Sequence, residues 1–410
     1  MSPRLRVLFA TAEAHPTHRA DVRVLFGEAL PRDGIDVDLI ATTTPQKADA
    51  PWSGGRAFLR VAASRKAEMF GDLWQQVSLM WRCGGYDALV VRDKPVLGAI
   101  GWLAARLWRI RFCYWMSYPM PQAYLTIAAR NDGSVGRLRR IWLRMRGRLG
   151  QFVLDRLLVP RADWLFVQTE AMERALRQRG LSHDRVTPVP MGVDVDAIPA
   201  PAAAPPEPLR GRPAAVYLGT LDRNRNPELL VDAARRVAAR LPGFVMIVVG
   251  EADEPADRGW LERYAEETGA GDAVWFTGWL PYAEGLALAR HAAVGISPIP
   301  RSPLTEVGSP TKAVEYLACG LPVVANDQPD QAHVVLASGG GVVVPFTAEG
   351  FANGIVEVLG DPDAWRERAG RARDWVAGSR SYRVLGGLVA TRLRECVASG
   401  SLADADGLRP

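Results

Sequence analysis

The sequence predicts an α/β fold built from two doubly wound parallel sheets, and three observations support this prediction. Short apolar runs alternate with amphipathic helical periods along most of the chain, which is the pattern of βαβ units. The 410 residues exceed what one ordinary hydrophobic core holds, so two domains are expected. A proline- and alanine-rich linker, residues 197–212, separates two such halves and suits neither a helix nor an inner strand.

The first domain is expected to span residues 1–196 and the second residues 213–376. A helix over 377–397 is expected to pack back on the first domain, followed by a frayed tail over 398–410. The expected strands of the first half cover residues 6–10, 37–41, 88–91, 112–116, 164–168 and 186–189. Those of the second half cover 214–219, 244–249, 274–277, 294–297, 322–325 and 341–344, with helices that include 227–239, 260–268 and 311–318.

Composition excludes several classes of protein. Apolar residues make up 48% of the chain and charged residues 23%, which is globular composition. The longest uncharged apolar run is about half of the ~20 residues that a spanning helix needs, and the N-terminus enters a strand-like run without a signal-like segment. The four cysteines are too scattered for a disulfide framework or a zinc site. We therefore expect a cytoplasmic protein without a bound metal.

The charge is distributed unevenly between the two halves. Residues 1–200 carry 29 Lys and Arg against 19 Asp and Glu, a balance of +10, and the remaining 21 against 26 give −5. A basic first half is typical of a protein that meets an anionic partner, such as nucleic acid, a membrane surface or a phosphorylated lipid.

One motif near residue 310 suits an anion. Ser309 reads as an N-cap with Pro310 at the first helical position, so free backbone N–H groups and a positive helix end are expected there. Lys312 adds a full positive charge in the first turn, and Glu315 lies on the same helix face. The alternative is that Lys312 and Glu315 form an ordinary exposed intrahelical pair.

A second loop, after the expected strand 214–219, carries two more cations. Gly219 allows close approach of the backbone to a ligand, and Arg223 and Arg225 precede a helix. Loop arginines are often simply solvated, but guanidinium groups also grip diphosphates. With Lys312, two loops of the second half offer three cations around one point, which suits a departing nucleoside diphosphate.

A third motif completes an ordered set. Residues 162–169 read Ala-Asp-Trp-Leu-Phe-Val-Gln-Thr, residues 189–194 read Val-Pro-Met-Gly-Val-Asp, and residues 309–320 read Ser-Pro-Thr-Lys-Ala-Val-Glu-Tyr-Leu-Ala-Cys-Gly. With Tyr-Leu-Gly-Thr-Leu at 217–221 and Val-Trp-Phe-Thr-Gly at 274–278, the chain resembles glycosyltransferase family 4, from the first strand to about residue 375. The resemblance implies the GT-B fold: two Rossmann-like domains that face each other across a cleft.

The resemblance also implies roles for residues of the second half. Arg225, with Arg223 as a plausible partner, matches the basic residue that holds the donor diphosphate, and Glu315 matches the glutamate that binds the donor ribose. The loop at 276–278 matches the one that reads the base, and 308–311 the donor-phosphate turn. The expected donor-binding set is Gly219, Thr220, Arg223, Thr277, Gly278, Gly308, Ser309 and Thr311, beside Arg225, Lys312 and Glu315 as the reacting-site residues.

The chain departs from the family pattern at three places. Val307 stands where the family's first motif glutamate is expected, and Glu306, one position away, is a candidate substitute. The first-domain histidine is replaced by Ser117-Tyr118-Pro119, and the first glycine-rich loop by residues 13–21. Sugar and acceptor are therefore open. His15, His18, Arg19 and Tyr118 are the candidate acceptor-side residues, although a histidine is more often structural.

A basic amphipathic helix is expected between residues 130 and 152. Seven arginines flank one acid, and apolar residues recur at helical spacing on one face. A solvated arginine face is the plain alternative, but an interfacial membrane helix also has this pattern. The expected membrane-contacting residues are Arg137, Arg140, Trp142, Arg144 and Arg148. No nucleic-acid motif is present, so a nucleic-acid partner is not expected.

The sequence thus predicts a retaining glycosyltransferase that needs neither cofactor nor metal. Its donor would be a nucleotide-diphosphate sugar, with UDP and GDP both open, and its acceptor a glycan or a polyprenyl-diphosphate-linked glycan in cell-surface polysaccharide biosynthesis. It would lie peripherally on the inner face of the membrane. The alternatives are a sugar-nucleotide epimerase on the same fold and a non-catalytic subunit of a polysaccharide assembly complex.

Overall fold

The computed structural model describes residues 4–405, except 48, 62–73, 76, 131–135, 182 and 201–203. These residues form two compact units. Unit 1 comprises residues 1–190 and 382–410, and unit 2 comprises residues 191–381. The division falls before the expected boundary at residue 196, and the described part of the 197–212 segment belongs to unit 2.

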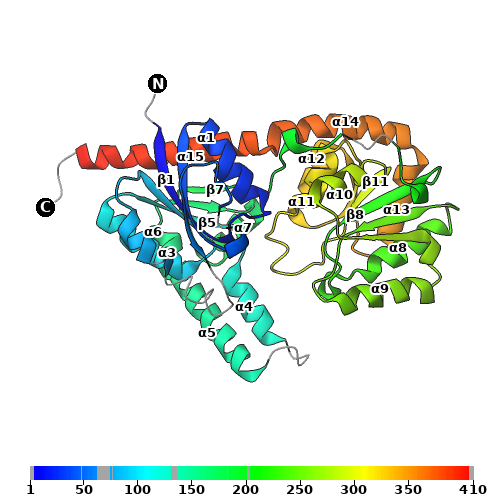
Figure 1. Cartoon of the computed structure of the whole chain (residues 1–410), viewed down its shortest axis with the longest axis horizontal. Helices are drawn as coiled ribbons and strands as arrows, with labels where there is room; N and C mark the ends of the chain where they lie inside the picture. Colours follow the sequence, from blue (N-terminus) through cyan, green and yellow to red (C-terminus); the bar gives the residue numbers. More distant parts are fainter. Residues whose placement is uncertain are drawn as a thin grey trace. The chain divides into compact units, whose positions relative to one another are not determined.

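Unit 1 contains a seven-stranded parallel sheet with the strand order β3-β2-β1-β4-β5-β6-β7 (Figure 1). The strands are β1 (Leu5–Ala14), β2 (Ile35–Thr43), β3 (Ala57–Val61), β4 (Ala88–Arg92), β5 (Arg111–Met116), β6 (Trp164–Val167) and β7 (Val186–Pro188). Six of these were expected from apolar runs. The edge strand β3 was not, because its side chains are only partly buried and form no such run.

Helices cover both faces of this sheet. One face packs against η1 (Asp21–Ala29) and α15 (Tyr382–Ala405), whose Leu385, Val389 and Leu393 join the same core as Phe9 and Val90. The opposite face carries α3 (Pro95–Trp108), α5 (Arg137–Val153), η3 (Leu154–Leu158) and α6 (Val159–Arg161). This unit also contains α1 (Leu30–Arg32), α4 (Met120–Ala129) and α7 (Glu170–Gln178), and residues 77–82 are helical as well.

The C-terminal helix differs from its expected bounds. α15 starts at Tyr382 and is helical to Ala405. It therefore includes the first residues of the tail over 398–410 that was expected to be frayed. Residues 406–410 of this tail lie outside the described residues. Its apolar side chains are buried in the core of unit 1, so the chain returns to the first unit after completing the second.

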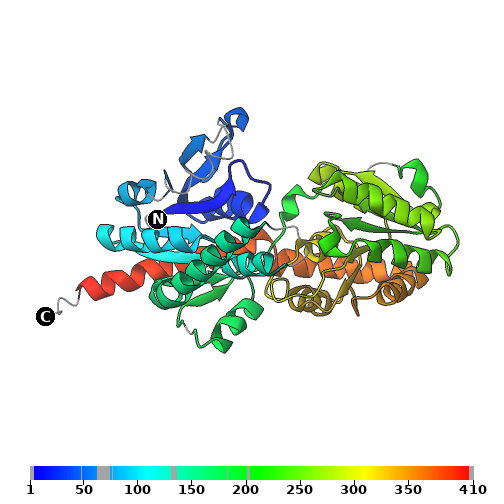
Figure 2. The same cartoon turned by 90° about the horizontal axis from the view of Figure 1, so that it is seen from below.

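Unit 2 contains a six-stranded parallel sheet with the order β10-β9-β8-β11-β12-β13. Figure 2 shows strands of this unit between helices. The strands, all expected from the sequence, are β8 (Ala214–Leu218), β9 (Val245–Val249), β10 (Val274–Gly278), β11 (Val294–Ser297), β12 (Val323–Asn326) and β13 (Gly341–Val344). The helices are α8 (Glu228–Ala238), α9 (Pro255–Glu267), α10 (Tyr282–Ala289), α11 (Thr311–Ala318), α12 (Pro329–Ser338), α13 (Ala348–Gly360) and α14 (Pro362–Ser379).

Each sheet has a point where the strand order reverses, between β1 and β4 in unit 1 and between β8 and β11 in unit 2. In open parallel sheets, ligands bind in the crevice at the carboxyl ends of the strands at such a switch point. The loops that follow these four strands are therefore the first places to look for a site.

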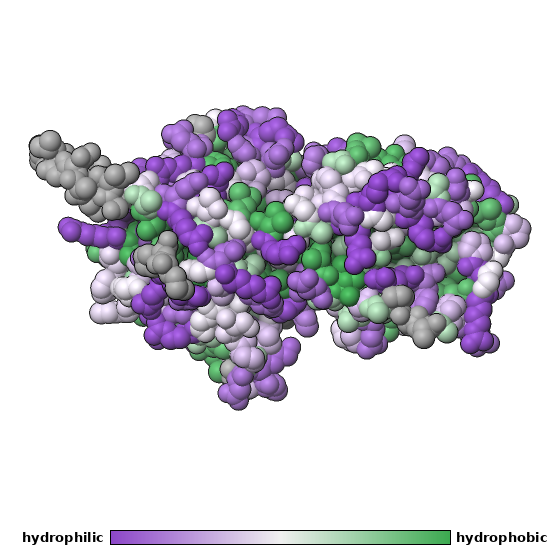
Figure 3. Space-filling model, turned by 90° about the horizontal axis from the view of Figure 1, so that it is seen from above, coloured by the Kyte–Doolittle hydropathy of each residue, from purple (hydrophilic) through white to green (hydrophobic). Residues whose placement is uncertain are grey.

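The face of the molecule drawn in Figure 3 carries mainly hydrophilic side chains with smaller hydrophobic patches.

Candidate functional site

The switch point of unit 2 brings together two loops that the sequence singled out. The loop after β8 contains Gly219, Thr220 and Arg225, and the chain after β11 leads into α11, whose first turn contains Lys312. Lys312 lies directly against the first of these loops. A Cβ atom placed on Gly219 would lie 2.7 Å from Cε and 3.0 Å from Nζ of Lys312, so a side chain at this position would displace the amine.

The Lys312 amine, held against the loop after β8, lies in an environment that disfavours its positive charge. Removal from solvent, with a smaller effect of the positive charge of Arg225, lowers the pKa of Lys312 to about 8. The carboxylate of Glu315 acts to raise this pKa, but its effect is smaller than that of Arg225. The Lys312 ammonium also lies 5.3 Å from the ring centroid of Tyr217, a cation–π contact. Two like charges held together at partial burial are unfavourable without an anion, and an anionic ligand would relieve the repulsion.

Glu315 lies one turn after Lys312 on α11. Its Oε1 accepts a hydrogen bond of 3.1 Å from the hydroxyl of Tyr282, which starts α10. Desolvation raises the pKa of the Glu315 carboxyl above its ordinary value, against the opposing charge of Lys312 and the hydrogen bonds from Tyr282 and Thr311. The carboxyl is therefore a hydrogen-bond acceptor in a poorly solvated place, beside the cations of the switch point.

Arg223 points to a different partner from Arg225. Its Nε donates to Oδ1 of Asp257 at 3.0 Å, and its guanidinium lies 4.1 Å from the ring centroid of Trp260, both on α9. Among the described residues, Arg225 forms a long ion pair of 4.0 Å with Asp222. Of the three expected cations, Arg223 is thus bound to Asp257, whereas the charge of Arg225 acts on Lys312.

The loop before α11 has a different arrangement from the one expected. Pro310, with ψ of 134°, is the N-cap and Thr311 the first helical residue, so Ser309 is not the cap and that expectation was wrong. The Ser309 hydroxyl instead accepts from the Met191 backbone N–H at 2.9 Å and donates to Asp330 at 2.6 Å. The Gly308 carbonyl accepts from the Gln328 amide at 2.9 Å.

Glu306, the candidate substitute for the missing glutamate, is held in an ion pair. Its Oε1 accepts from Nη2 and Nε of Arg301 at 2.8 and 3.1 Å, and the same arginine contacts Asp327 at 2.7 Å. Val307 follows it in the chain, as the sequence shows. The carboxylate of Glu306 is therefore engaged within its own loop.

Two further expected donor-side positions have distinct environments. The Thr277 hydroxyl donates to the carbonyl of Gly278 at 2.9 Å, and Gly278 adopts φ of 78°, which favours glycine. The hydroxyl of Thr220, next to Gly219, is buried and has no hydrogen-bond partner among the described residues. A buried hydroxyl without a partner is costly, so Thr220 contributes an unsatisfied polar group to this loop.

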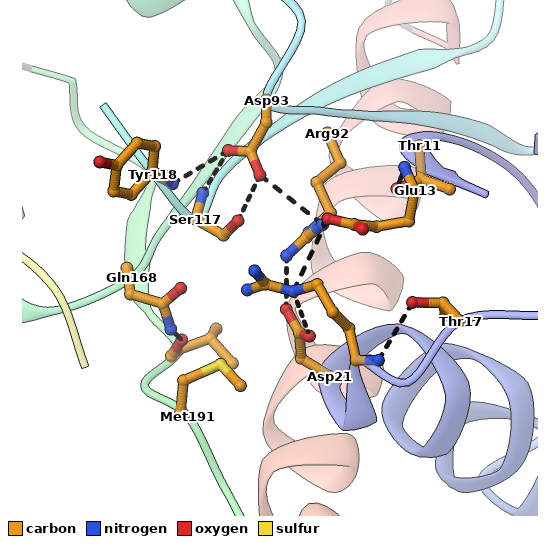
Figure 4. Close-up of polar contacts among 12 residues, drawn as sticks. Thr11, Glu13, Thr17, Asp21, Arg92, Asp93, Ser117, Tyr118, Gln168 and Met191 are labelled. Carbon is orange, nitrogen blue, oxygen red and sulfur yellow. Dashed lines mark hydrogen bonds and ion pairs between the residues drawn. The ribbon is translucent and has the colours of Figure 1, made fainter. Parts of the chain in front are cut away.

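The switch point of unit 1 holds a cluster of buried charges that the sequence did not single out (Figure 4). Arg92, at the end of β4, is 1% exposed. Its guanidinium contacts Asp21 at 2.6 Å, Glu13 at 3.3 Å and Asp93 at 3.7 Å. Although burial acts to raise the pKa of the Asp21 carboxyl, the charges of Arg92 and Arg19 hold it below its ordinary value.

Asp93 fixes the turn that follows β5. Its Oδ1 accepts from the backbone N–H groups of Ser117 and Tyr118 at 2.7 and 3.1 Å, and its Oδ2 accepts from the Ser117 hydroxyl. Asp93 itself adopts φ of 59°, a left-handed conformation that is uncommon outside glycine. Burial raises the pKa of Asp93, against the charge of Arg92 and these hydrogen bonds. The turn at residues 117–118 is thereby held at the switch point.

The candidate acceptor-side residues are divided around this cluster. His15 is buried, its Nε2 hydrogen-bonds the Ala50 carbonyl at 3.1 Å, and its ring contacts Trp52, which indicates a structural role. His18 is exposed, and Arg19 pairs with Asp21 at 3.2 Å. Tyr118 is 40% exposed and its backbone is held by Asp93. The signal for the missed cluster was present: polar residues Arg92 and Asp93 directly follow a buried strand.

The expected basic helix is α5, which forms a hairpin with α4 in unit 1 (Figure 1). Only a narrow stripe of it is buried, consisting of Leu143, Gly147 and Gly150. The apolar face identified in the sequence is exposed, with Leu138 at 83%, Trp142 at 52% and Met145 at 68%. The exposed face continues with Leu149 and Phe152, and the arginines that flank it include the exposed Arg137, Arg144 and Arg148 and the partly buried Arg140.

No group of three or more His, Cys, Asp and Glu side chains in the described part of the chain is arranged to hold a metal ion. Likewise, none of the helices within the described ranges has the length and apolar character needed to cross a membrane.

Comparisons with known proteins agree with this architecture. The family model described as glycosyl transferase 4-like domain matches residues 24–192, and the one described as glycosyl transferases group 1 matches residues 212–361. Among curated proteins, the chain is 27% identical over 303 residues to a D-inositol 3-phosphate glycosyltransferase of Gordonia bronchialis, covering 70% of this chain and 62% of that one. It is 29% identical over 245 residues to a phosphatidyl-myo-inositol mannosyltransferase of Mycobacterium tuberculosis, covering 56% and 61%. The chain thus spans less than two thirds of these relatives.

Solved structures show the same fold. The chain resembles a sucrose-phosphate synthase from Thermosynechococcus elongatus with a TM-score of 0.70 and 19% identity, over 97% of this chain and 100% of that one. It resembles HepE of Anabaena in a complex with UDP with a TM-score of 0.69 and 17% identity, over 95% and 100%. With two consecutive family models and two doubly wound sheets, the chain belongs to the family 4 glycosyltransferases and has the GT-B fold.

Proposed function

We propose that this chain is a retaining glycosyltransferase that moves a sugar from a nucleoside diphosphate sugar to a hydroxyl of a glycan or a lipid-linked glycan. The observation that carries the proposal is the Lys312 amine at the switch point of unit 2, held against the backbone of Gly219 on the loop that also carries Arg225. Relatives that act on inositol phosphates and phosphatidylinositol, and a fold neighbour in a complex with UDP, support the same substrate classes.

The proposed reaction breaks the bond between the anomeric carbon and the diphosphate oxygen and forms one to the acceptor oxygen on the same face. The acceptor hydroxyl gives its proton to the departing diphosphate. Lys312, Arg225 and the N–H groups at the start of α11 stabilise the negative charge that grows on the leaving group. These fixed cations supply the charge that a divalent metal supplies in other transferases, so we propose a metal-independent enzyme that needs no cofactor.

Glu315 has the position and chemistry to bind the ribose of the donor. Its carboxyl is poorly solvated and, within the described part of the chain, accepts hydrogen bonds from the side chains of Tyr282 and Thr311, which leaves acceptor capacity for a further donor. A ribose hydroxyl that donates to Glu315 would replace lost solvent contacts. Thr220, whose hydroxyl has no partner among the described residues, is proposed to donate to the diphosphate.

We propose that unit 1 holds the acceptor at its own switch point. The Asp93–Ser117–Tyr118 turn lies at the carboxyl end of its sheet, where ligands of such sheets bind. His18 and Arg19 belong to the loop after β1 at the same end. The buried position of His15 makes it a support of this loop rather than a contact of the acceptor.

We also propose that α5 docks unit 1 on the cytoplasmic face of a membrane. Its exposed apolar stripe lies between exposed arginines, an arrangement that suits an anionic leaflet, where each arginine contributes about 1 kcal/mol. Such docking would bring a lipid-linked acceptor, for example a polyprenyl-diphosphate glycan of cell-surface polysaccharide biosynthesis, to the enzyme.

The activity is tested by incubating the purified chain with labelled UDP- and GDP-sugars and a lipid extract of membranes. Transfer of label to lipid or glycan supports the proposal. An isomerised donor without transfer would identify an epimerase, and nucleotide binding without turnover a non-catalytic subunit; either result would overturn it. Stereochemistry follows from the anomeric configuration of the product, and metal independence from activity that survives a chelator.

Membrane docking is tested with vesicles that contain phosphatidylglycerol. We expect binding to be lost when three exposed arginines of α5 are changed to glutamate, and to persist when three exposed arginines of unit 2 are changed in the same way. The α5 set is Arg137, Arg144 and Arg148, and the control set is Arg235, Arg366 and Arg371. Equal binding by both triple variants would refute docking by α5.

A further inference from the structure

An apolar groove on unit 1 is not used by any part of the proposed reaction. It has a volume of about 570 Å³ and lies between the C-terminal end of α3 and the helical residues 77–82. Its lining consists of Val77, Met80, Trp81, Leu107 and Trp108. The volume is in the range of small-molecule sites, and all five lining residues are apolar or aromatic.

The walls of the groove are held in place from behind. The Trp108 indole N–H donates to the Met80 carbonyl at 2.8 Å, which links α3 to the opposite wall. The Trp108 ring also packs on Gly84, where a Cβ atom would lie 2.8 Å from it. The apolar surface that faces outward is large: Trp81 is 78% exposed and Leu107 64%. The end of α3 and the opposite wall are therefore joined at the Trp108 side chain.

The apolar surface continues along α3. Val96, Leu103 and Leu107 are exposed and Ile100 is partly buried, and their spacing of four, three and four residues places them on one face of the helix. From Val96 to Leu107 this stripe is about 16 Å long at 1.5 Å per residue. The opposite face of α3 is buried against the sheet, where Gly101 packs on β4 and β5. Contiguous exposed apolar surface of this kind marks a binding surface.

Three arginines lie next to lining residues of the groove in the sequence, at positions 82, 106 and 109. Arg109, in the left-handed conformation, ends the helix directly after Trp108, and Arg82 follows Trp81. Both are exposed, and within the described residues neither forms an ion pair, although Arg82 stacks on Phe58 at 4.2 Å. Arg106 is exposed as well, and its Nη2 lies 3.7 Å from Oδ1 of Asp163 in an ion pair. An occupant with an apolar chain and an anionic head matches this combination of surface and charge.

We propose that this groove binds the hydrocarbon chain of an anionic membrane lipid, with the phosphate of the lipid near Arg82 and Arg109. Tryptophan side chains are enriched where protein meets the boundary between hydrocarbon and head groups, which fits the exposed Trp81 and the half-exposed Trp108. The inference deepens the proposed membrane contact of unit 1, on which it rests for the class of partner. It adds the capture of a single lipid chain by α3 to the adsorption of α5 on the surface.

The test uses a monomeric lipid, so that adsorption to a bilayer does not contribute. Lauroyl-lysophosphatidylglycerol, kept below its critical micelle concentration, is titrated into the full chain by calorimetry. We expect saturable binding with one lipid per chain. Glycerol phosphate, which has the head group without the chain, is expected not to bind measurably. The α5 triple variant is expected to bind this monomer as the natural chain does.

Substitutions in the groove provide the decisive comparison. Leu107→Glu places a carboxylate in the apolar groove and is expected to weaken lipid binding by about tenfold or more. Trp81→Gln, at a more exposed position, is expected to weaken it as well. Leu336→Glu, on α12 of unit 2 and 69% exposed, is the matched control and is expected to leave binding unchanged. Circular dichroism and the thermal midpoint establish that each variant is folded.

The proposal would be overturned by an absence of saturable lipid binding, by equal binding of glycerol phosphate, or by unchanged binding by Leu107→Glu and Trp81→Gln. Loss of monomer binding in the α5 variant would also overturn it, because the chain would then bind at α5. Glycosyl transfer to a water-soluble acceptor, measured separately, reports on the proposed enzyme activity alone. The two proposals therefore fail independently.

Discussion

Lys312 makes nucleotide binding depend on pH in a direction that the structure defines. The pKa of Lys312 in the free protein is lowered to about 8 by desolvation and by Arg225. A bound diphosphate would favour the ammonium form and raise the pKa again. Binding therefore requires protonated Lys312, and affinity must fall as the pH rises through the pKa of the free protein.

The expected size of the effect follows from the fraction of protonated amine. With a pKa near 8, about nine tenths of the free protein carries the ammonium at about pH 7 and about one tenth at about pH 9. The association constant for UDP or GDP is therefore expected to fall by about tenfold between these pH values. At a pH equal to the pKa, each binding event takes up about half a proton.

Isothermal titration calorimetry measures both quantities. Titrations in buffers of different ionisation enthalpy give the number of protons taken up, and a pH series gives the affinity. Lys312→Gln is expected to bind more weakly at neutral pH and to show no proton uptake. Lys47→Gln, which removes an exposed lysine of unit 1, is the control. A wild-type affinity that does not change between about pH 7 and 9, or a Lys312→Gln variant with the wild-type profile, would refute the reasoning.

Three further substitutions have defined outcomes. Gly219→Ala is expected to weaken nucleotide binding by about tenfold because its methyl group displaces the Lys312 amine. The control Gly370→Ala, in α14 with open space around it, is expected to leave binding unchanged and to raise stability by up to about 1 kcal/mol. Equal binding by both variants would contradict this expectation. Tyr282→Phe removes the hydrogen bond to Glu315 and is expected to cost about 1 kcal/mol of nucleotide affinity by calorimetry; an unchanged affinity would argue against a role for this pair. Arg92→Met leaves buried carboxylates without their cation and is expected to lower the free energy of unfolding in urea by about 3–5 kcal/mol; a loss below about 1 kcal/mol would show that the cluster is solvated.

Most of the fold was predictable because parallel strands buried on both faces leave an apolar run in the sequence. The residues 294–297 and 323–326 illustrate this, since every side chain in both strands is buried. The edge strand β3 has partly buried side chains and left no such run. The left-handed residue Asp93 and the π-helical segment η1 follow from tertiary contacts rather than local propensity, so no local pattern predicted them.

The candidate site was predictable to the level of loops but not of side-chain direction. Lys312 and Arg225 follow adjacent strands of one parallel sheet, so topology alone brings their loops together. The partners of Arg223 and Glu306 are Asp257 and Arg301, and these depend on how each loop turns its side chains. Tyr282, which hydrogen-bonds Glu315, comes from a third loop that carries no charged motif.

The most direct test of the account is a crystal structure of the chain with whichever of UDP and GDP binds more tightly. The account predicts that the diphosphate lies at the start of α11, with its oxygens within hydrogen-bonding distance of both Lys312 Nζ and the Arg225 guanidinium. A diphosphate bound away from these two side chains, or contacted by only one of them, would contradict it.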